Sequence, residues 1–99
     1  MLSEVERFQQ DLLESAKQMY INQRGSVFLS NASSSTRRVV IEPWAVEFEL
    51  PSKSYCEVVS VGGSLPPDIE VEDDEYGFMF WINNMGAIYE YWQDGELID

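Results

Sequence analysis

The chain contains no histidine, a single cysteine and only six basic residues among its 99 positions. Histidine is the commonest general base and the commonest zinc ligand, so its absence removes the usual means of acid–base catalysis and of zinc binding. Cys56 alone cannot form an intrachain disulfide or a thiolate cluster, and the sequence supplies no base to activate it as a nucleophile. We therefore expect a non-enzymatic protein without a cofactor, in which Cys56 is a small buried strand residue.

Long apolar runs and a basic N-terminal leader are also missing. No segment approaches the eighteen apolar residues typical of a membrane span, and the first six residues include two acids where a signal peptide carries positive charge. The lone cysteine gives no indication of an oxidising compartment. We expect a cytoplasmic protein, encoded by a bacterium or by a phage.

Acidic residues are abundant, and they are unevenly placed. Eighteen acids and six bases give a formal charge of −12, and residues 39–99 hold fourteen of those acids with Lys53 as their single base. Nucleic acids and anionic membranes are poor partners for such a chain, because binding them requires clustered lysine and arginine. A field of this sign keeps a protein soluble or steers it onto a basic partner.

The N-terminal segment has the pattern of an amphipathic helix over about residues 4–24. Ser3 and Glu6 have the spacing of a capping box, and Gly25 follows Arg24 where a helix typically ends. Apolar residues recur every three or four positions between these signals. They are Val5, Phe8, Leu12, Ala16 and Met19. This helix needs a surface against which to pack.

The remainder, about residues 26–98, has the alternating pattern of strands. Turn and loop signals separate the segments that we predict as strands. These segments are 26–30, 37–42, 44–50, 55–61, 68–72, 78–82, 87–92 and, as a last short strand, 96–98. We expect 55–61 to return antiparallel to 44–50, and 78–82 to form a hairpin with 87–92 in which Ile82 lies opposite Ala87.

The predicted hairpin is apolar on both faces, which is typical of strands that are covered on both sides. One face would carry Phe78, Phe80, Ile82, Ala87, Tyr89 and Tyr91. Covering the two faces requires the helix on one side and the other strands on the other. The sequence thus predicts a single α+β domain over residues 1–99, with the helix packed on a mainly antiparallel sheet or sandwich of about six or seven strands.

Two charged motifs have structural explanations. The acidic run from Asp68 to Glu75 resembles a calcium loop in charge, but the sixth and twelfth positions of an EF-hand, glycine and glutamate, are here Asp73 and Met79. A solvated acidic turn is the better interpretation. The adjacent Arg37 and Arg38 are expected to pair with nearby carboxylates rather than to hold an anion.

The segment Ile41-Glu42-Pro43-Trp44-Ala45-Val46-Glu47-Phe48-Glu49-Leu50-Pro51, followed by Tyr55-Cys56-Glu57-Val58-Val59, resembles a group of small uncharacterised bacterial proteins. In these β-rich proteins a Glu-Pro-Trp segment, an acidic strand and a proline turn precede a valine-rich strand. The resemblance covers about twenty residues. It implies a β-rich fold and carries over no activity.

The function that these patterns favour is a non-catalytic protein-binding module, of the immunity or inhibitor type, that engages a basic partner. The carboxylates predicted to do so are Glu47, Glu49, Glu57, Glu70, Glu72, Asp73, Asp74 and Glu75. One alternative is an apolar or uncharged ligand held in a pocket of the rings Phe78, Phe80, Trp81, Tyr89, Tyr91 and Trp92. Another is an accessory domain that self-associates through the helix or a free strand edge.

Overall fold

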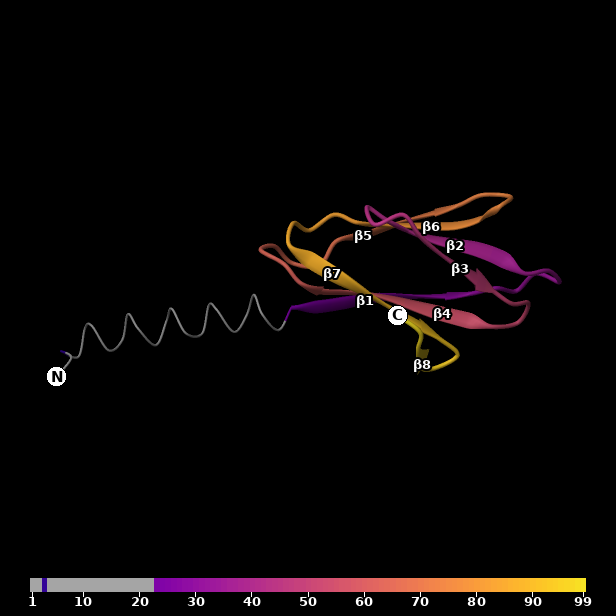
Figure 1. Ribbon diagram of the computed structural model, residues 1–99, viewed down its shortest axis with the longest axis horizontal. Coiled ribbons are helices and arrows are strands. Elements are labelled where there is room, and N and C mark those ends of the chain that lie inside the picture. Colours follow the sequence, from indigo (N-terminus) through magenta and orange to yellow (C-terminus); the bar gives the residue numbers. More distant parts are fainter. Residues whose placement is uncertain (1–2, 4–22) are drawn as a thin grey trace.

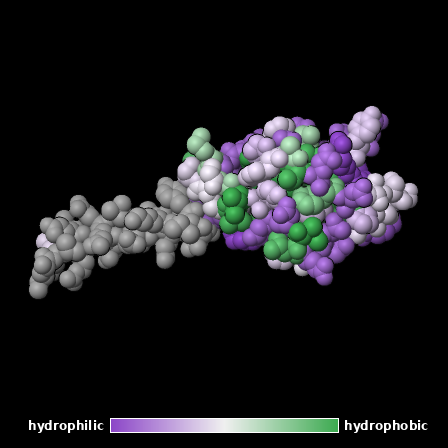
Figure 2. Space-filling model, viewed as in Figure 1, coloured by the Kyte–Doolittle hydropathy of each residue, from purple (hydrophilic) through white to green (hydrophobic). Residues whose placement is uncertain are grey.

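The computed structural model describes Ser3 and residues 23–99, and this part of the chain is all-β (Figure 1). It contains eight strands and no helix. The strands are β1 Arg24–Ser30, β2 Arg37–Glu42, β3 Val46–Leu50, β4 Tyr55–Gly62, β5 Ile69–Asp73, β6 Gly77–Ile82, β7 Ala87–Gln93 and β8 Glu96–Leu97. Hydrophilic residues cover most of the visible surface of this part, and exposed hydrophobic residues form separate patches on it (Figure 2).

The strands form two four-stranded sheets that face each other (Figure 1). Sheet A has the order β1-β4-β7-β8, and sheet B has the order β3-β2-β6-β5. All neighbouring pairs are antiparallel except β2 and β6, which are parallel. Within the described residues there is no helix long and apolar enough to span a bilayer.

The α+β prediction is therefore wrong for the described part of the chain. The predicted helix lies outside the described residues, apart from its last two positions, and its predicted end is misplaced. Arg24 belongs to β1, and Gly25 pairs with Ser60 of β4 instead of ending a helix. A steric constraint explains glycine at position 25, because a Cβ there would lie 2.5 Å from the Cβ of Pro67. The two sheets cover each other's inner faces, so no helix is required to complete this core.

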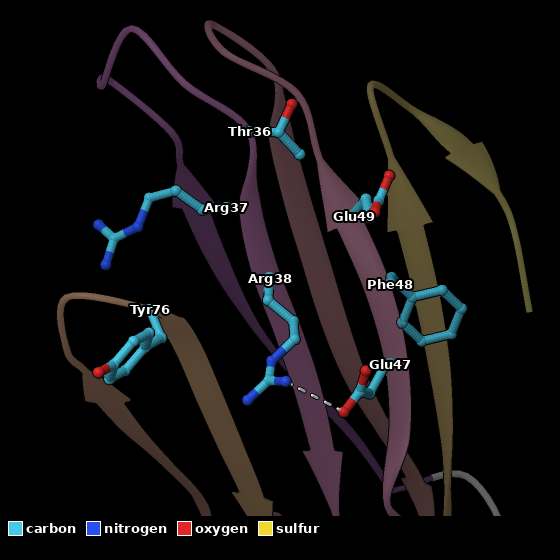
Figure 3. Close-up of a pocket in the computed structure, with 7 residues that line it drawn as sticks. All are labelled: Thr36, Arg37, Arg38, Glu47, Phe48, Glu49 and Tyr76. Atoms are coloured by element: carbon cyan, nitrogen blue, oxygen red, sulfur yellow. Dashed lines mark ion pairs between the residues drawn. The ribbon is translucent and has the colours of Figure 1, made fainter.

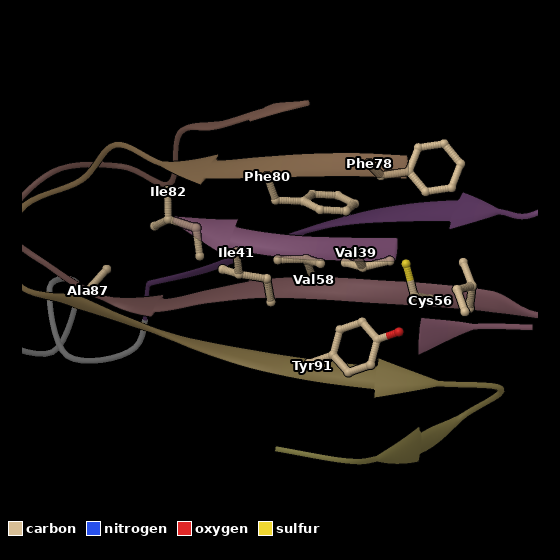
Figure 4. Close-up of a cluster of buried hydrophobic side chains, with 10 residues drawn as sticks. Val39, Ile41, Cys56, Val58, Phe78, Phe80, Ile82, Ala87 and Tyr91 are labelled. Carbon is tan, nitrogen blue, oxygen red and sulfur yellow. The ribbon is translucent and has the colours of Figure 1, made fainter. Parts of the chain in front are cut away.

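Alternation along the strands builds the core between the sheets (Figure 4). Val39 and Ile41 of β2 and Phe80 of β6 meet Val58 and Tyr91 of sheet A, and all five are fully buried. Burying a side chain of this size contributes roughly 1.5–3 kcal/mol. The predicted burial of Cys56 is confirmed, since it is a fully buried residue of β4. Burial raises the pKa of its thiol to about 12.

Both predicted hairpin pairings are wrong, although the strand positions are close to those expected. Strand β4 pairs with β1 and β7 rather than with β3, and β6 pairs with β2 and β5 rather than with β7. The four residues after β6 cross from sheet B to sheet A, so the apolar faces of β6 and β7 face each other across the core. Asn84 stabilises this crossing: its side chain is buried, accepts a hydrogen bond from Ser60 Oγ at 3.0 Å and donates one to the Gly62 carbonyl at 3.2 Å.

Candidate functional site

The outer face of sheet B brings together four of the carboxylates that the sequence singles out. Glu47 and Glu49 belong to β3 and Glu70 and Glu72 to β5, the two edge strands of this sheet. All four are exposed, and Glu47 and Glu49 alternate with Val46, Phe48 and Leu50, which pack in or against the core. Charged side chains on edge strands are a common means of preventing unwanted strand pairing. Here they also place carboxylates along both sides of one surface.

Strand register fixes the neighbours across this surface. Glu47 lies opposite Val40 of β2, Val40 lies beside Met79 of β6, and Met79 lies opposite Glu72 of β5. One step along the strands, Trp81 lies between Glu42 and Glu70. We call this surface the acidic face. Its members are Arg38, Val40, Glu42, Glu47, Glu49, Glu70, Glu72, Gly77, Met79 and Trp81.

The acidic face carries five carboxylates and one guanidinium, a formal charge of −4. Its single ion pair joins Arg38 Nη1 to Glu47 Oε1 at 3.5 Å, and both side chains are more than half exposed. Pairs with this exposure contribute at most about 1 kcal/mol. None of the other four carboxylates has an ion-pair partner among the described residues. Cationic groups of another molecule therefore have accessible partners here.

A hollow of about 520 Å³ lies at the Arg38 end of the acidic face (Figure 3). Arg38 and Glu47 point towards each other along one side of it, and the exposed ring of Tyr76 lies on the other side. Its remaining lining residues are Thr36, Arg37, Phe48 and Glu49. The hollow holds charges of both signs beside aromatic rings.

Asp73, the last residue of β5, and Asp74, in the turn that follows it, were also predicted to bind a partner, and both have structural contacts. Arg37 Nη2 donates to Asp73 Oδ1 at 2.7 Å and to the Asp74 carbonyl, while its guanidinium lies over the Phe78 ring. Asp74 Oδ1 accepts hydrogen bonds from the backbone amides of Tyr76 and Gly77 at 2.8 and 3.0 Å. These contacts order the turn. The prediction that Arg37 and Arg38 pair with carboxylates is confirmed.

The two remaining predicted residues lie away from the acidic face. Glu75 is exposed at the turn before β6. Glu57 lies on the outer face of sheet A, between Phe28 of β1 and Trp92 of β7. Sheet A is the opposite layer of the sandwich, so Glu57 cannot act on the same flat surface as the β3 and β5 carboxylates.

The six rings of the alternative aromatic pocket are divided among different parts of the fold. Phe78, Phe80 and Tyr91 are core residues, and Tyr89 is partly buried against the same core. Trp81 is 37% exposed on the acidic face, and Trp92 is half-buried on the outer face of sheet A. Because these rings lie in different layers, they do not line a common pocket.

Six members of the acidic face were absent from the carboxylate site predicted from the sequence, and Glu42, Met79 and Trp81 are the three that give the face its central chemistry. Each alternates with core residues of its own strand, so its outward position was visible in the sequence. Their meeting depends on the parallel pairing of β2 with β6, which alternation does not reveal. Among the described residues, no three potential metal ligands come together as a group.

Comparison with known proteins assigns no family to this geometry. No protein-family model, curated protein or solved structure matches the chain.

Proposed function

We propose that this protein is a non-catalytic binding module, of the immunity or inhibitor type, that engages a basic protein through the acidic face. The observation that carries the proposal is the placement of five carboxylates around Val40, Met79 and Trp81 with Arg38 as the one base. The cytoplasmic location expected from the sequence is part of the same proposal. A basic partner is favoured over a nucleic acid, whose phosphates this face would repel.

The arrangement of the face suits long cationic side chains. Lysine and arginine bury their methylene stems on apolar surfaces while their charged groups remain near polar atoms. Met79 and Trp81 provide such a surface, with carboxylates on both sides. A guanidinium stacked on the exposed Trp81 ring would also be within reach of Glu42 and Glu70, which combines cation–π attraction with ion pairing.

Electrostatics favours the complex as well. Neighbouring carboxylates at the two edges repel one another in the free protein, and a partner's cations would relieve that repulsion. Arg38 is the internal competitor, but its long, exposed pair with Glu47 can rearrange at little cost. Such attraction accelerates association and is weakened by salt.

The test compares two double variants that change the net charge equally. Glu70→Gln with Glu72→Gln neutralises one side of the acidic face, whereas Glu57→Gln with Glu96→Gln neutralises two acids of sheet A. Titration with an oligoarginine peptide at low salt should show up to about tenfold weaker binding for the first variant, corresponding to about 1.4 kcal/mol. The second variant should lose much less affinity for the peptide. Equal losses would mean that only total charge matters and would overturn the proposal.

A further inference from the structure

Strand β1 forms one edge of sheet A and has a neighbour on one side only. All seven of its residues pair with β4. Within the described part of the chain, no strand pairs with its other edge. The outward N–H and C=O groups of an edge strand are a ready template for another strand. As far as the described residues go, this edge of β1 is therefore open to pairing along its full length.

The other edge strands carry features that prevent pairing with a further strand, and β1 does not. Strand β3 carries Glu47 and Glu49, and β5 carries acids at three of its five positions. Strand β8 is only two residues long. By contrast, β1 has no acidic residue, and Arg24, its single charge, is bound by Glu90 of β7. In a chain of charge −12, β1 thus presents no carboxylate of its own to a second copy.

The side chains of β1 are incompletely covered. Phe28 is 63% exposed on the outer face of sheet A, although its ring lies near Tyr55, with centroids 6.4 Å apart. Val27 and Leu29 point towards the core but are only partly buried at its margin. A strand added at this edge would cover the apolar side chains on both faces of β1.

We propose that β1 pairs antiparallel with β1 of a second copy of this chain, joining the two A sheets into one. With Val27 on the two-fold axis, all seven residues of each strand are paired, Arg24 lies opposite Ser30, and the two Phe28 rings become diagonal neighbours. Self-pairing of β3 or β5 would instead place glutamates beside glutamates. The β1 contact is isologous, so it closes as a dimer and does not propagate into a filament.

This dimer does not depend on the proposed function. If both are correct, the dimer would present two acidic faces to a basic partner. A two-fold axis perpendicular to the joined sheet places both B sheets on the same side of it. Their acidic faces would then point in the same direction, and a partner with two basic sites could bind both with increased avidity. The dimer should strengthen as salt is added, because salt screens the repulsion between two acidic copies. Binding of a basic partner should weaken under the same change.

The first test is the mass of the full chain by sedimentation equilibrium, from micromolar to millimolar concentration at physiological salt. The wild-type chain should form a dimer, and Phe28→Glu should be a monomer because it places two carboxylates beside the two-fold axis. Ile88→Glu is the matched control, since Ile88 is 60% exposed on the same outer face but belongs to β7. It should remain dimeric. A monomeric wild-type chain, or equal loss in both variants, would overturn the proposal.

Cross-linking tests the register. In the proposed dimer the two Val27 residues face each other, so Val27→Cys should form a disulfide-linked dimer on mild oxidation. Ser30→Cys should not, because the two copies of that position lie about 20 Å apart, six residues at about 3.4 Å each. The native Cys56 is fully buried and does not interfere. Failure of the first variant to cross-link, or equally efficient linking of the second, contradicts this pairing.

Discussion

The two outer faces of this sandwich share one core but differ in chemistry. The acidic face of sheet B carries five carboxylates, one of them paired with Arg38. The outer face of sheet A carries exposed apolar residues and only two carboxylates, Glu57 and Glu90. Its exposed large apolar residues are Phe28, Tyr55, Ile88 and Leu97. We call this second surface the apolar face.

The difference shows how far the chemistry of a surface is independent of the fold beneath it. Successive residues of a strand point to opposite faces of the sheet, so residues that face the core alternate with residues on the outer face. Arg38 and Glu42 thus alternate with the buried Val39 and Ile41 on β2. The same packing leaves one layer free to become acidic and the other to remain apolar. Two kinds of contact can therefore coexist in fewer than a hundred residues.

The largest expected effect comes from the core that both faces share. Phe80→Ala removes a fully buried ring between the sheets and should destabilise the protein by about 3–5 kcal/mol. Phe28→Ala removes an exposed ring of the apolar face and should cost only about 0.5 kcal/mol in dilute solution. Urea unfolding followed by tryptophan fluorescence measures both. Similar costs would show that the apolar face supports the fold as strongly as the core does.

A smaller effect is expected at Gly77, where the acidic face depends on a close approach between strands. A Cβ at this position would lie 2.0 Å from the Arg38 carbonyl oxygen, so Gly77→Ala must push β6 away from β2. Overpacking against backbone should cost about 3 kcal/mol. In the control Gly62→Ala the new methyl meets no atom within 4 Å, and the positive φ of 77° should cost only about 1 kcal/mol. If the two unfolding free energies fall equally, the strands are not in contact as described.

Alternation predicted which residues are inside, but not which strands are neighbours. Strand β2 has the bounds expected from the sequence, and Phe78, Phe80 and Tyr91 are buried as expected. The same residues satisfy either a hairpin or two strands facing each other across a core, because both arrangements cover the same apolar side chains. Which arrangement forms depends on chain segments that cross between the sheets, such as the one that Asn84 stabilises. A single asparagine in a polar loop does not reveal from the sequence that it stabilises such a crossing.

For the candidate site, as for the fold, the sequence predicted which residues point outwards but not which strands bring them together. Glu47, Glu49, Glu70 and Glu72 were identified as outward carboxylates, and they do share one face. Their separation by β2 and β6, and so the presence of Trp81 among them, follows from a parallel pairing between strands far apart in the sequence. The contacts of Asp73 and Asp74 with Arg37 and the backbone also arise only in the folded turn.

Repulsion among the carboxylates should produce a modest difference between the faces. Glu70→Gln with Glu72→Gln should raise the thermal midpoint at low salt by a few degrees, since about 0.5 kcal/mol corresponds to roughly 2–4 °C in a domain of this size. Glu57→Gln with Glu96→Gln, which changes the net charge equally, should raise it less. Physiological salt should raise the wild-type midpoint and reduce the difference between variants. A wild-type midpoint that is flat or falls with salt would show that the charges are well dispersed.

The smallest expected effect concerns the one strongly paired carboxylate of the apolar face. Hydrogen bonds from Arg24, at 2.8 and 3.2 Å, and from Trp92 Nε1, at 3.0 Å, lower the pKa of Glu90 below its ordinary 4.5. The unfolded chain therefore takes up this proton first as the pH falls, so the stabilisation is full above about pH 4.5 and is lost as the pH drops through the lower folded value.

Glu90→Gln should consequently be less stable than the wild-type protein at pH 7, by about 0.3 kcal/mol because the pair is partly solvent-exposed. At an acidic pH below 4.5 the gap should be smaller, because the wild-type carboxyl also becomes protonated as the pH falls through its lowered pKa. Glu49→Gln on the acidic face is the control: its carboxylate has no ion pair among the described residues, so neutralising it at pH 7 should not destabilise the protein. Urea unfolding at both pH values measures these differences. A Glu90→Gln deficit that stays constant with pH would place its cause in packing, and the two faces would then not differ in how they hold their carboxylates.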